Sequence, residues 1–238
     1  DSGVPITHST LASVRGTTSP LFSIGVTTYD RDVLLRETVQ SILAQTCTDF
    51  ELLIGNDNPG RLITQDSLVV HYSRVQIVNH PKNLGEHGNM NALLAMGRGR
   101  YFTWMADDDL YAPTFLSAVR VALDRFDNPP CVFTSSTRRR ELFDEWSKRT
   151  DWPMQEYTGR EFLDEYLSRT IHVIGSCGTF LVKLLKDLGG MQRLGTGFSP
   201  YSDNLLAIRS ARLSQIIHID APLVFYRDHE GSPSHNSA

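Results

Sequence analysis

The densest group of chemistry-bearing residues is the run Asp107-Asp108-Asp109, which directly follows the apolar, strand-like segment Tyr101–Met105. Three carboxylates at the end of a strand concentrate negative charge. Hard divalent ions such as Mg2+ and Mn2+ take oxygen ligands of this kind together with substrate phosphates. The alternative is a solvated turn whose aspartates cap a helix beginning near Pro113. The run alone leaves both interpretations open.

Two further polar loops, Thr27–Arg31 and Asn56–Gly60, follow the first and second predicted strands. Ligands of open parallel sheets bind outside the carboxyl ends of the strands, so we expect these loops and the aspartate run to line one pocket. There Asp57 can accept a hydrogen bond from a base or a ribose hydroxyl, and Tyr29 can pack on a nucleobase. With a metal ion on the aspartates, the three loops predict a nucleotide diphosphate pocket.

Short apolar strands are predicted to alternate with amphipathic helices. The predicted strands are Leu21–Val26, Phe50–Ile54, Val75–Val78, Tyr101–Met105, Cys131–Thr134, Gly178–Val182, Ile216–Ile219 and Leu223–Tyr226. The predicted helices are Leu35–Leu43, Asn89–Met96, Thr114–Phe126, Arg160–Leu167 and Ser202–Ala211. This alternation is typical of an α/β fold with a mostly parallel sheet flanked by helices.

The domain organisation follows from composition and rhythm. Residues 1–20 are rich in Ser, Thr, Gly and Pro, which predicts a flexible N-terminal arm. Residues 21–238 are predicted to form a single domain with a nucleotide-binding half at 21–127. The less regular rhythm after Phe126 predicts a mixed, acceptor-binding half at 128–238.

Charge and cysteine usage exclude several classes. The net charge is -4, from 23 Lys and Arg against 27 Asp and Glu, so a nucleic-acid partner is not expected. Cys47, Cys131 and Cys177 are too widely spaced to predict a disulfide framework or a zinc site. No transmembrane segment is predicted, since no apolar stretch approaches about 18 residues. We therefore expect a cytoplasmic protein, with peripheral membrane contact left open.

Three ordered segments carry a family resemblance. Ser23–Arg31, then Asn83-Leu84-Gly85 with Asn91, then Tyr101–Asp109 resemble the motifs of family 2 glycosyltransferases of the GT-A fold. The resemblance implies a Rossmann-like GT-A domain and an inverting, metal-dependent enzyme. It also implies a nucleotide-sugar donor, a UDP-sugar being the commonest, a Mn2+ or Mg2+ cofactor, and a hydroxyl or amine acceptor on a carbohydrate, glycoconjugate or small molecule.

On the donor side, the resemblance assigns nucleoside binding to Thr27, Tyr29 and Asp57, and metal binding to Asp109. Asn83, in the Asn-x-Gly motif, is placed in the same donor site. Relatives often read Asp-x-Asp-Asp at the strand end, whereas this chain has Ala106 at the first of those positions and an additional aspartate at Asp107. Either Asp107 or Asp108 is therefore expected to contact the ribose. Met90 stands where many relatives have arginine, which leaves the nucleobase open.

On the acceptor side, Ser202-Asp203 stands where relatives carry a Glu-Asp pair, and the resemblance makes Asp203 the general base. The alternative is that the pair only caps the following helix. Tyr226-Arg227-Asp228-His229 resembles a Tyr-Arg-x-His segment of the family. It implies that His229 completes the metal shell or touches the diphosphate and that Arg227 lies beside it; a solvated terminal loop is the alternative.

Two other functions share these features. A nucleotidyltransferase would have the same sheet and carboxylates, but it should carry a glycine-rich basic loop after the first strand, which Thr27–Arg31 does not provide. A non-catalytic sugar- or nucleotide-binding module stays open, and donor hydrolysis would separate it from an enzyme. Trp146, Trp152 and Tyr157 are expected either to form a lid or sugar platform or to lie in the core.

Overall fold

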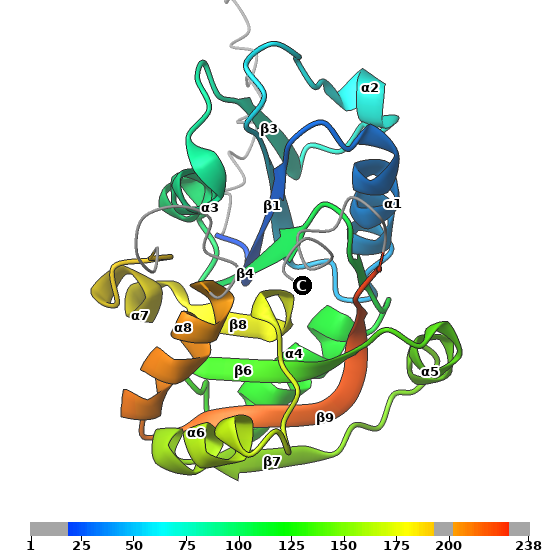
Figure 1. Ribbon diagram of the computed structural model, residues 1–238. Helices are drawn as coiled ribbons and strands as arrows, with labels where there is room; N and C mark the ends of the chain where they lie inside the picture. The colour runs from blue at the N-terminus through cyan, green and yellow to red at the C-terminus, as the bar shows by residue number, and fades with distance from the viewer. Residues whose placement is uncertain (1–18, 193–201, 229–238) are drawn as a thin grey trace, which may run out of the picture.

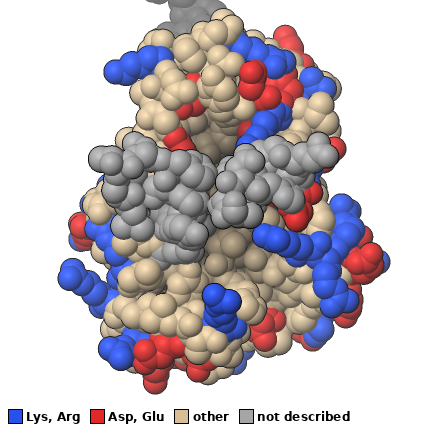
Figure 2. All heavy atoms as spheres, in the orientation of Figure 1, with Lys and Arg blue, Asp and Glu red and all other residues tan. Residues whose placement is uncertain are grey.

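The structure is a computed structural model that describes residues 19–192 and 202–228 (Figure 1, Figure 2). The strands are β1 (Phe22–Thr28), β2 (Phe50–Asn56), β3 (Val75–Asn79), β4 (Tyr101–Ala106), β5 (Leu110–Tyr111), β6 (Cys131–Thr137), β7 (Met154–Tyr157), β8 (Gly178–Leu181) and β9 (Ile216–Phe225). The helices are α1 (Asp32–Leu43), α2 (Gln65–Leu68), α3 (Gly85–Met96), α4 (Phe115–Arg125), α5 (Arg140–Trp146), α6 (Gly159–Leu167), α7 (Val182–Asp187) and α8 (Ser202–Arg209), with 3-10 turns η1 (Gly175–Cys177) and η2 (Ser210–Arg212). Most of the predicted arm, residues 1–18, lies outside the described residues.

The described strands form one sheet in the order β3-β2-β1-β4-β8-β6-β9-β5, with β7 also paired to β9. The β3-β2-β1-β4 half is wholly parallel. Strand β8 runs antiparallel to both β4 and β6, β6 is parallel to β9, and β5 and β7 are antiparallel to β9. The predicted α/β class, parallel in the first half and mixed in the second, is confirmed.

Helices cover both faces of the parallel half, and α1 and α3 lie on opposite sides of it in Figure 1. Strand β1 is consequently buried almost throughout, as expected of a strand covered on both faces. Helix α1 forms because Leu35, Val39 and Ile42 recur at helical spacing, and all three are fully buried. This packing fixes α1 beside the end of β4, where the aspartate run begins.

One prediction of the strand pattern is wrong. The two final strands predicted at Ile216–Ile219 and Leu223–Tyr226 are a single strand, β9. The sequence between them contains Pro222, which lacks an N–H and indicates a break. The pairing with β6 instead shifts register on either side of Ser135, which lies opposite Pro222, so the irregularity is absorbed within a continuous strand.

Several short elements are absent from the predicted set, namely α2, β5, α5, β7 and α7. Helix α5 begins at Arg140. Trp146, Trp152 and Tyr157, which were expected either in a lid or in the core, are half-buried and pack against the core.

Among the residues described, no helix combines the length and apolar character that crossing a bilayer requires.

Candidate active site

The structure brings the three polar loops together at the carboxyl edge of the parallel half. In the sheet register Thr28 lies opposite Asn56, and Thr27 lies opposite Ala106. The N–H of Asp57 also donates to the carbonyl of Thr28 at 3.0 Å. The loops after β1, β2 and β4 therefore begin side by side, where ligands of such sheets bind.

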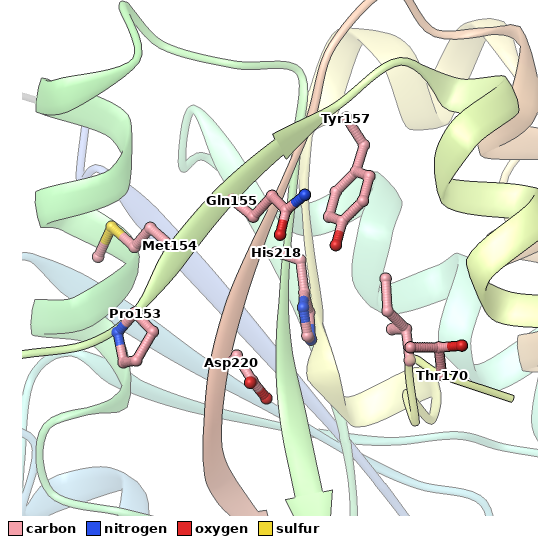
Figure 3. Close-up of a pocket in the computed structure, with 8 residues that line it drawn as sticks. Pro153, Met154, Gln155, Tyr157, Thr170, His218 and Asp220 are labelled. Carbon is pink, nitrogen blue, oxygen red and sulfur yellow. The ribbon is translucent and has the colours of Figure 1, made fainter.

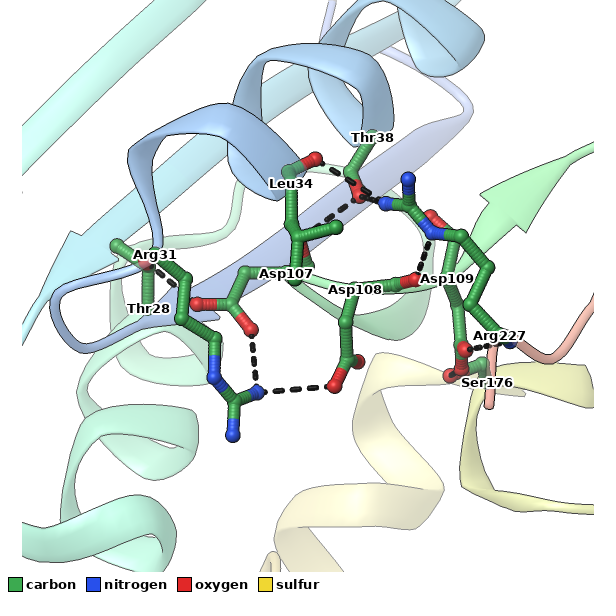
Figure 4. Close-up of polar contacts among 9 residues, drawn as sticks. All are labelled: Thr28, Arg31, Leu34, Thr38, Asp107, Asp108, Asp109, Ser176 and Arg227. Atoms are coloured by element: carbon green, nitrogen blue, oxygen red, sulfur yellow. Dashed lines mark hydrogen bonds and ion pairs between the residues drawn. The ribbon is translucent and has the colours of Figure 1, made fainter. Parts of the chain in front are cut away.

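Asp107 and Asp108 face the loop after β1 (Figure 4). The Thr28 hydroxyl donates to Asp107 Oδ2 at 2.6 Å. Arg31 Nη1 lies 3.0 Å from Asp107 Oδ1 and 2.9 Å from Asp108 Oδ2, so one guanidinium group bridges two carboxylates. Burial raises the pKa of Asp107, although the Thr28 hydrogen bond and the Arg31 charge oppose the effect.

Asp109 points away from Arg31, toward η1 and the end of β9 (Figure 4). Its Oδ1 accepts from the backbone N–H of Arg227 at 3.2 Å, and its Oδ2 lies 3.5 Å from the Ser176 hydroxyl. Burial, followed by the neighbouring charge of Asp108, raises the pKa of Asp109 to about 7. The carboxyl group can therefore gain or lose a proton near neutral pH.

Thr38 of α1 holds the backbone of the aspartate run. Its fully buried hydroxyl lies 3.0 Å from the carbonyl oxygen of Asp107 and 2.8 Å from that of Asp109. Because the two carbonyls belong to the turn that carries the carboxylates, this single side chain sets how the turn is presented to the site.

The Arg227 side chain is directed at α1. Its Nε donates to the carbonyl of Asp108, its Nη1 pairs with Glu37, and its Nη2 lies 3.2 Å from the carbonyl of Leu34 and 3.2 Å from the Thr38 hydroxyl. These contacts join the end of β9 to α1 and to the aspartate run. They give Arg227 a positioning role, and the diphosphate contact implied by the resemblance stays a prediction.

The other donor-side residues lie around the same edge. Asp57 is buried, and its Oδ1 accepts from the Leu84 N–H at 2.7 Å, which joins the loop after β2 to the start of α3. Asn83 Oδ1 accepts from the N–H of Gly85, whose φ is +73°, so Asn83 shapes the turn into α3. Tyr29 is 52% exposed and Thr27 is half-buried; Tyr29 thus offers its ring at the surface.

Two expected site residues fall at the limit of what the structure describes. His229 lies outside the described residues. The backbone of Asp203 is in α8, one residue after its start, and its side chain is outside the described set. Helix α8 packs against η1, the turn whose Ser176 hydroxyl lies near Asp109.

The described carboxylates can be tested for their fit to a divalent ion. Within residues 19–192 and 202–228, no cluster of three or more His, Cys, Asp or Glu side chains is arranged as a metal site. An ion bound together with a diphosphate needs only one or two protein carboxylates. Asp109, buried beside the charge of Asp108, suits such an ion because a cation there would favour the ionised carboxylate.

Four positioning residues were missed from the sequence: Thr38, Glu37, Ser176 and, as a partner of the aspartates, Arg31. Arg31 could have been identified from the sequence, because a cationic residue after β1 is expected to face carboxylates at the end of the neighbouring strand β4. Thr38 and Ser176 had none, because each is an ordinary polar residue whose contact is 67 to 71 positions away in the chain.

A mixed α/β sheet with an acidic turn after β4 agrees with the GT-A fold, and comparison with known sequences identifies the family. Residues 23–189 match glycosyl transferase family 2. The chain therefore belongs to this family, as the resemblance implied.

Relatives among curated proteins are less informative about substrate. An uncharacterized glycosyltransferase of Rickettsia typhi is 28% identical over 174 residues, covering 72% of this chain and 53% of that protein. Another of Rickettsia prowazekii is 28% identical over 170 residues, covering 70% of this chain and 52% of that protein. The chain thus spans about half the length of these relatives.

Solved structures show the same fold at low identity. S. aureus TarS 1-349 in complex with UDP-GlcNAc has a TM-score of 0.66 at 16% identity, covering 91% of this chain and 61% of that one. The mannosyltransferase PcManGT from Pyrobaculum calidifontis, in complex with GDP-Man and Mn2+, has a TM-score of 0.61 at 18% identity, covering 91% and 59%. At these identities the likeness shows the fold alone.

Thr38→Val should destabilise the protein by about 1–3 kcal/mol, because a near-isosteric methyl leaves the buried carbonyls of Asp107 and Asp109 without their donor. Urea denaturation measures the change in the free energy of unfolding. Thr48→Val, at an exposed loop position, is the matched control and should stay within about 0.5 kcal/mol of wild type. Equal stability of the two variants would contradict the role given to Thr38.

The raised pKa of Asp109 predicts a pH dependence of stability in metal-free protein. Between pH 3.8, the ordinary value, and about 7, the folded state holds a proton that the unfolded state has released. The stability that Asp109 contributes is therefore fully present below pH 3.8 and is lost as the pH rises through about 7. Unfolding free energies measured with a chelator across this range should fall in wild type and fall less in Asp109→Asn. Asp124→Asn, at an exposed position of α4, should follow the wild-type profile. A wild-type profile for Asp109→Asn would contradict the assignment of this pH dependence to Asp109.

Proposed function

We propose that this protein is an inverting glycosyltransferase that moves a sugar from a nucleotide diphosphate sugar to an acceptor hydroxyl or amine. The observation that carries the proposal is the buried run Asp107–Asp109, held against the loop after β1 in a chain of glycosyl transferase family 2. A fold shared with TarS, in complex with UDP-GlcNAc, and with PcManGT, in complex with GDP-Man and Mn2+, supports this donor class.

In the proposed donor complex, the loops after β1 and β2 hold the nucleoside. The exposed ring of Tyr29 packs on the base, and Thr27 and Asp57 line the same edge. Asp107 or Asp108 binds the ribose, and Asn83 holds the turn that closes the pocket at α3. UDP is the proposed nucleotide. Because Arg31 already bridges Asp107 and Asp108, we expect its guanidinium to move when a donor binds.

The proposed metal ligand is Asp109, with His229 as a second candidate ligand beyond the described residues. When bound, Mn2+ or Mg2+ supplies Lewis-acid stabilisation of the charge that develops on the departing diphosphate. The protein's own part is to hold Asp109 in place through the Arg227 N–H and the Ser176 hydroxyl. Ionisation of Asp109 is required for this role, and its raised pKa makes ion binding weaker below neutral pH.

Asp203 is the proposed general base. It lies at the start of α8, and α8 packs on the turn that presents Ser176 to Asp109, which supports this assignment. The acceptor proton passes to the carboxylate as the acceptor oxygen or nitrogen attacks the anomeric carbon. Attack from the face opposite the diphosphate inverts the configuration in a single displacement, without a covalent protein intermediate.

Asp203→Asn should keep donor affinity and lose about 10²- to 10⁴-fold in turnover, since the amide preserves volume but accepts no proton. A coupled nucleotide-release assay with a panel of acceptors gives turnover, and calorimetry gives donor affinity. Ser202→Ala tests the helix-capping alternative at the neighbouring position and should retain turnover. Wild-type turnover in Asp203→Asn would reassign the base.

UDP binding should be strengthened by a divalent ion in wild type, and Asp109→Ala should abolish this metal-dependent binding, so that the variant binds UDP weakly with or without the ion. Titration calorimetry with UDP and with GDP, each with Mn2+ and with a chelator, measures the four affinities. The expected order is UDP with Mn2+ tightest in wild type, with little difference between Mn2+ and chelator in Asp109→Ala. Equal affinity with and without Mn2+ in wild type would overturn the metal role, and tighter GDP binding would overturn the choice of UDP.

A further inference from the structure

A second recess of about 290 Å³ lies between β7, the start of β9 and the segment after α6 (Figure 3). We call it the β7–β9 pocket. Polar side chains approach it from three parts of the chain: Gln155 and Tyr157 from β7, His218 and Asp220 at β9, and Thr170 after α6. Its volume is close to the lower end of the range for small-molecule sites, about 300 Å³.

His218 is the best-positioned polar group of the pocket. It is only 5% exposed, and its Nε2 lies 3.1 Å from the Ser135 hydroxyl, which fixes the ring. Within the part of the chain that the structure describes, Nδ1 has no hydrogen-bond partner, so it is available to a ligand. Burial lowers the pKa of His218, and the imidazole is therefore neutral at neutral pH.

The surrounding groups match a sugar ring. Gln155 offers an amide donor and acceptor, Thr170 a hydroxyl, and Asp220 a carboxylate, which together can pair with neighbouring hydroxyl groups. The ring of Tyr157 gives an apolar face with a polar end, and Pro153 adds apolar surface. The described lining includes no Lys or Arg and one acid, so an anionic ligand is disfavoured.

The pocket is joined to the candidate active site by one segment of chain. This segment leaves α6, lines the pocket at Thr170 and Ile171, crosses in front of β9 and β6, and ends at Ser176 beside Asp109 (Figure 1). Strand β9 and the two residues after it make a second connection, from Asp220 to Arg227. At ~3.3 Å per residue, these seven positions give a path of roughly 20 Å along the chain.

We infer that the β7–β9 pocket binds an uncharged sugar ring and that it is a remote subsite for a glycan acceptor of several units. The acceptor role rests on the proposed function, since only an extended acceptor would reach both the pocket and Asp109. The sugar-binding role rests on His218, Gln155, Tyr157 and Asp220 alone.

The test uses saturation-transfer NMR with methyl α-D-glucopyranoside, methyl α-D-galactopyranoside and methyl α-D-mannopyranoside, with free glucuronic acid as the anionic comparison. We expect wild type to bind at least one methyl hexoside more tightly than glucuronic acid. His218→Phe and Gln155→Ala should each weaken that binding by about three- to tenfold, the effect of one hydrogen bond.

Gln76→Ala is the matched control, because Gln76 is another exposed glutamine on an edge strand, β3, at the far side of the sheet. It should bind the hexoside like wild type. Gln155→Ala keeps the test decisive if His218→Phe fails to fold, because Gln155 is exposed and its truncation leaves the core unchanged. Absence of hexoside binding in wild type, preference for glucuronic acid, or unchanged binding in both pocket variants would overturn the inference.

Calorimetry with UDP and Mn2+ on the same proteins separates this inference from the proposed function. Hexoside binding without UDP binding would overturn the proposed function and leave a sugar-binding pocket. UDP binding without hexoside binding would overturn the pocket alone. For the acceptor role, the hexoside that binds is extended to linear oligomers. Affinity that rises with length in wild type but not in Gln155→Ala supports that role, and affinity independent of length overturns it.

Discussion

Three aspartates in succession at the end of β4 repel one another, and each is at least nine-tenths buried. Buried like charges are tolerated only where protons, cations or hydrogen bonds offset them. Arg31, in the loop after β1, offsets the charge of Asp107 and Asp108. Burial raises the pKa of Asp109, which favours its protonated, uncharged form. Much of the local structure, from α1 to the end of β9, is arranged around this concentration of charge.

The direction of β8 explains how distant segments reach that turn. Because β8 is antiparallel to both β4 and β6, β6 and its parallel neighbour β9 run in the same direction as β4. The carboxyl ends of β4 and β9 therefore lie at the same edge of the sheet, and the residue after Tyr226 can place its N–H against Asp109. The mixed second half of the sheet thus contributes residues to the same edge as the parallel first half.

The sequence predicted the parts of the site that depend on local pattern. The apolar segment Tyr101–Met105 followed by carboxylates predicted both β4 and the acidic turn, and helix α8 begins at Ser202 as expected. Contacts set by helix rotation and long-range pairing could not be predicted in this way. Thr38 reaches the turn only because the apolar side of α1 is fixed against the core. Strand β5 has two residues and exists through pairing with β9, so no periodicity reveals it.

Arg227 and Asp109 are 118 positions apart, and this separation has a consequence for synthesis on the ribosome. When β1 to β4 have emerged, their local parallel pairings can already form, but the acidic turn lacks the guanidinium group that binds the Asp108 carbonyl and Glu37. Contacts of such long sequence separation form late, since their loop-closure entropy is lost before any interaction is gained. The contacts between the aspartate run and the end of β9 are consequently expected to form after the parallel pairings of β1 to β4.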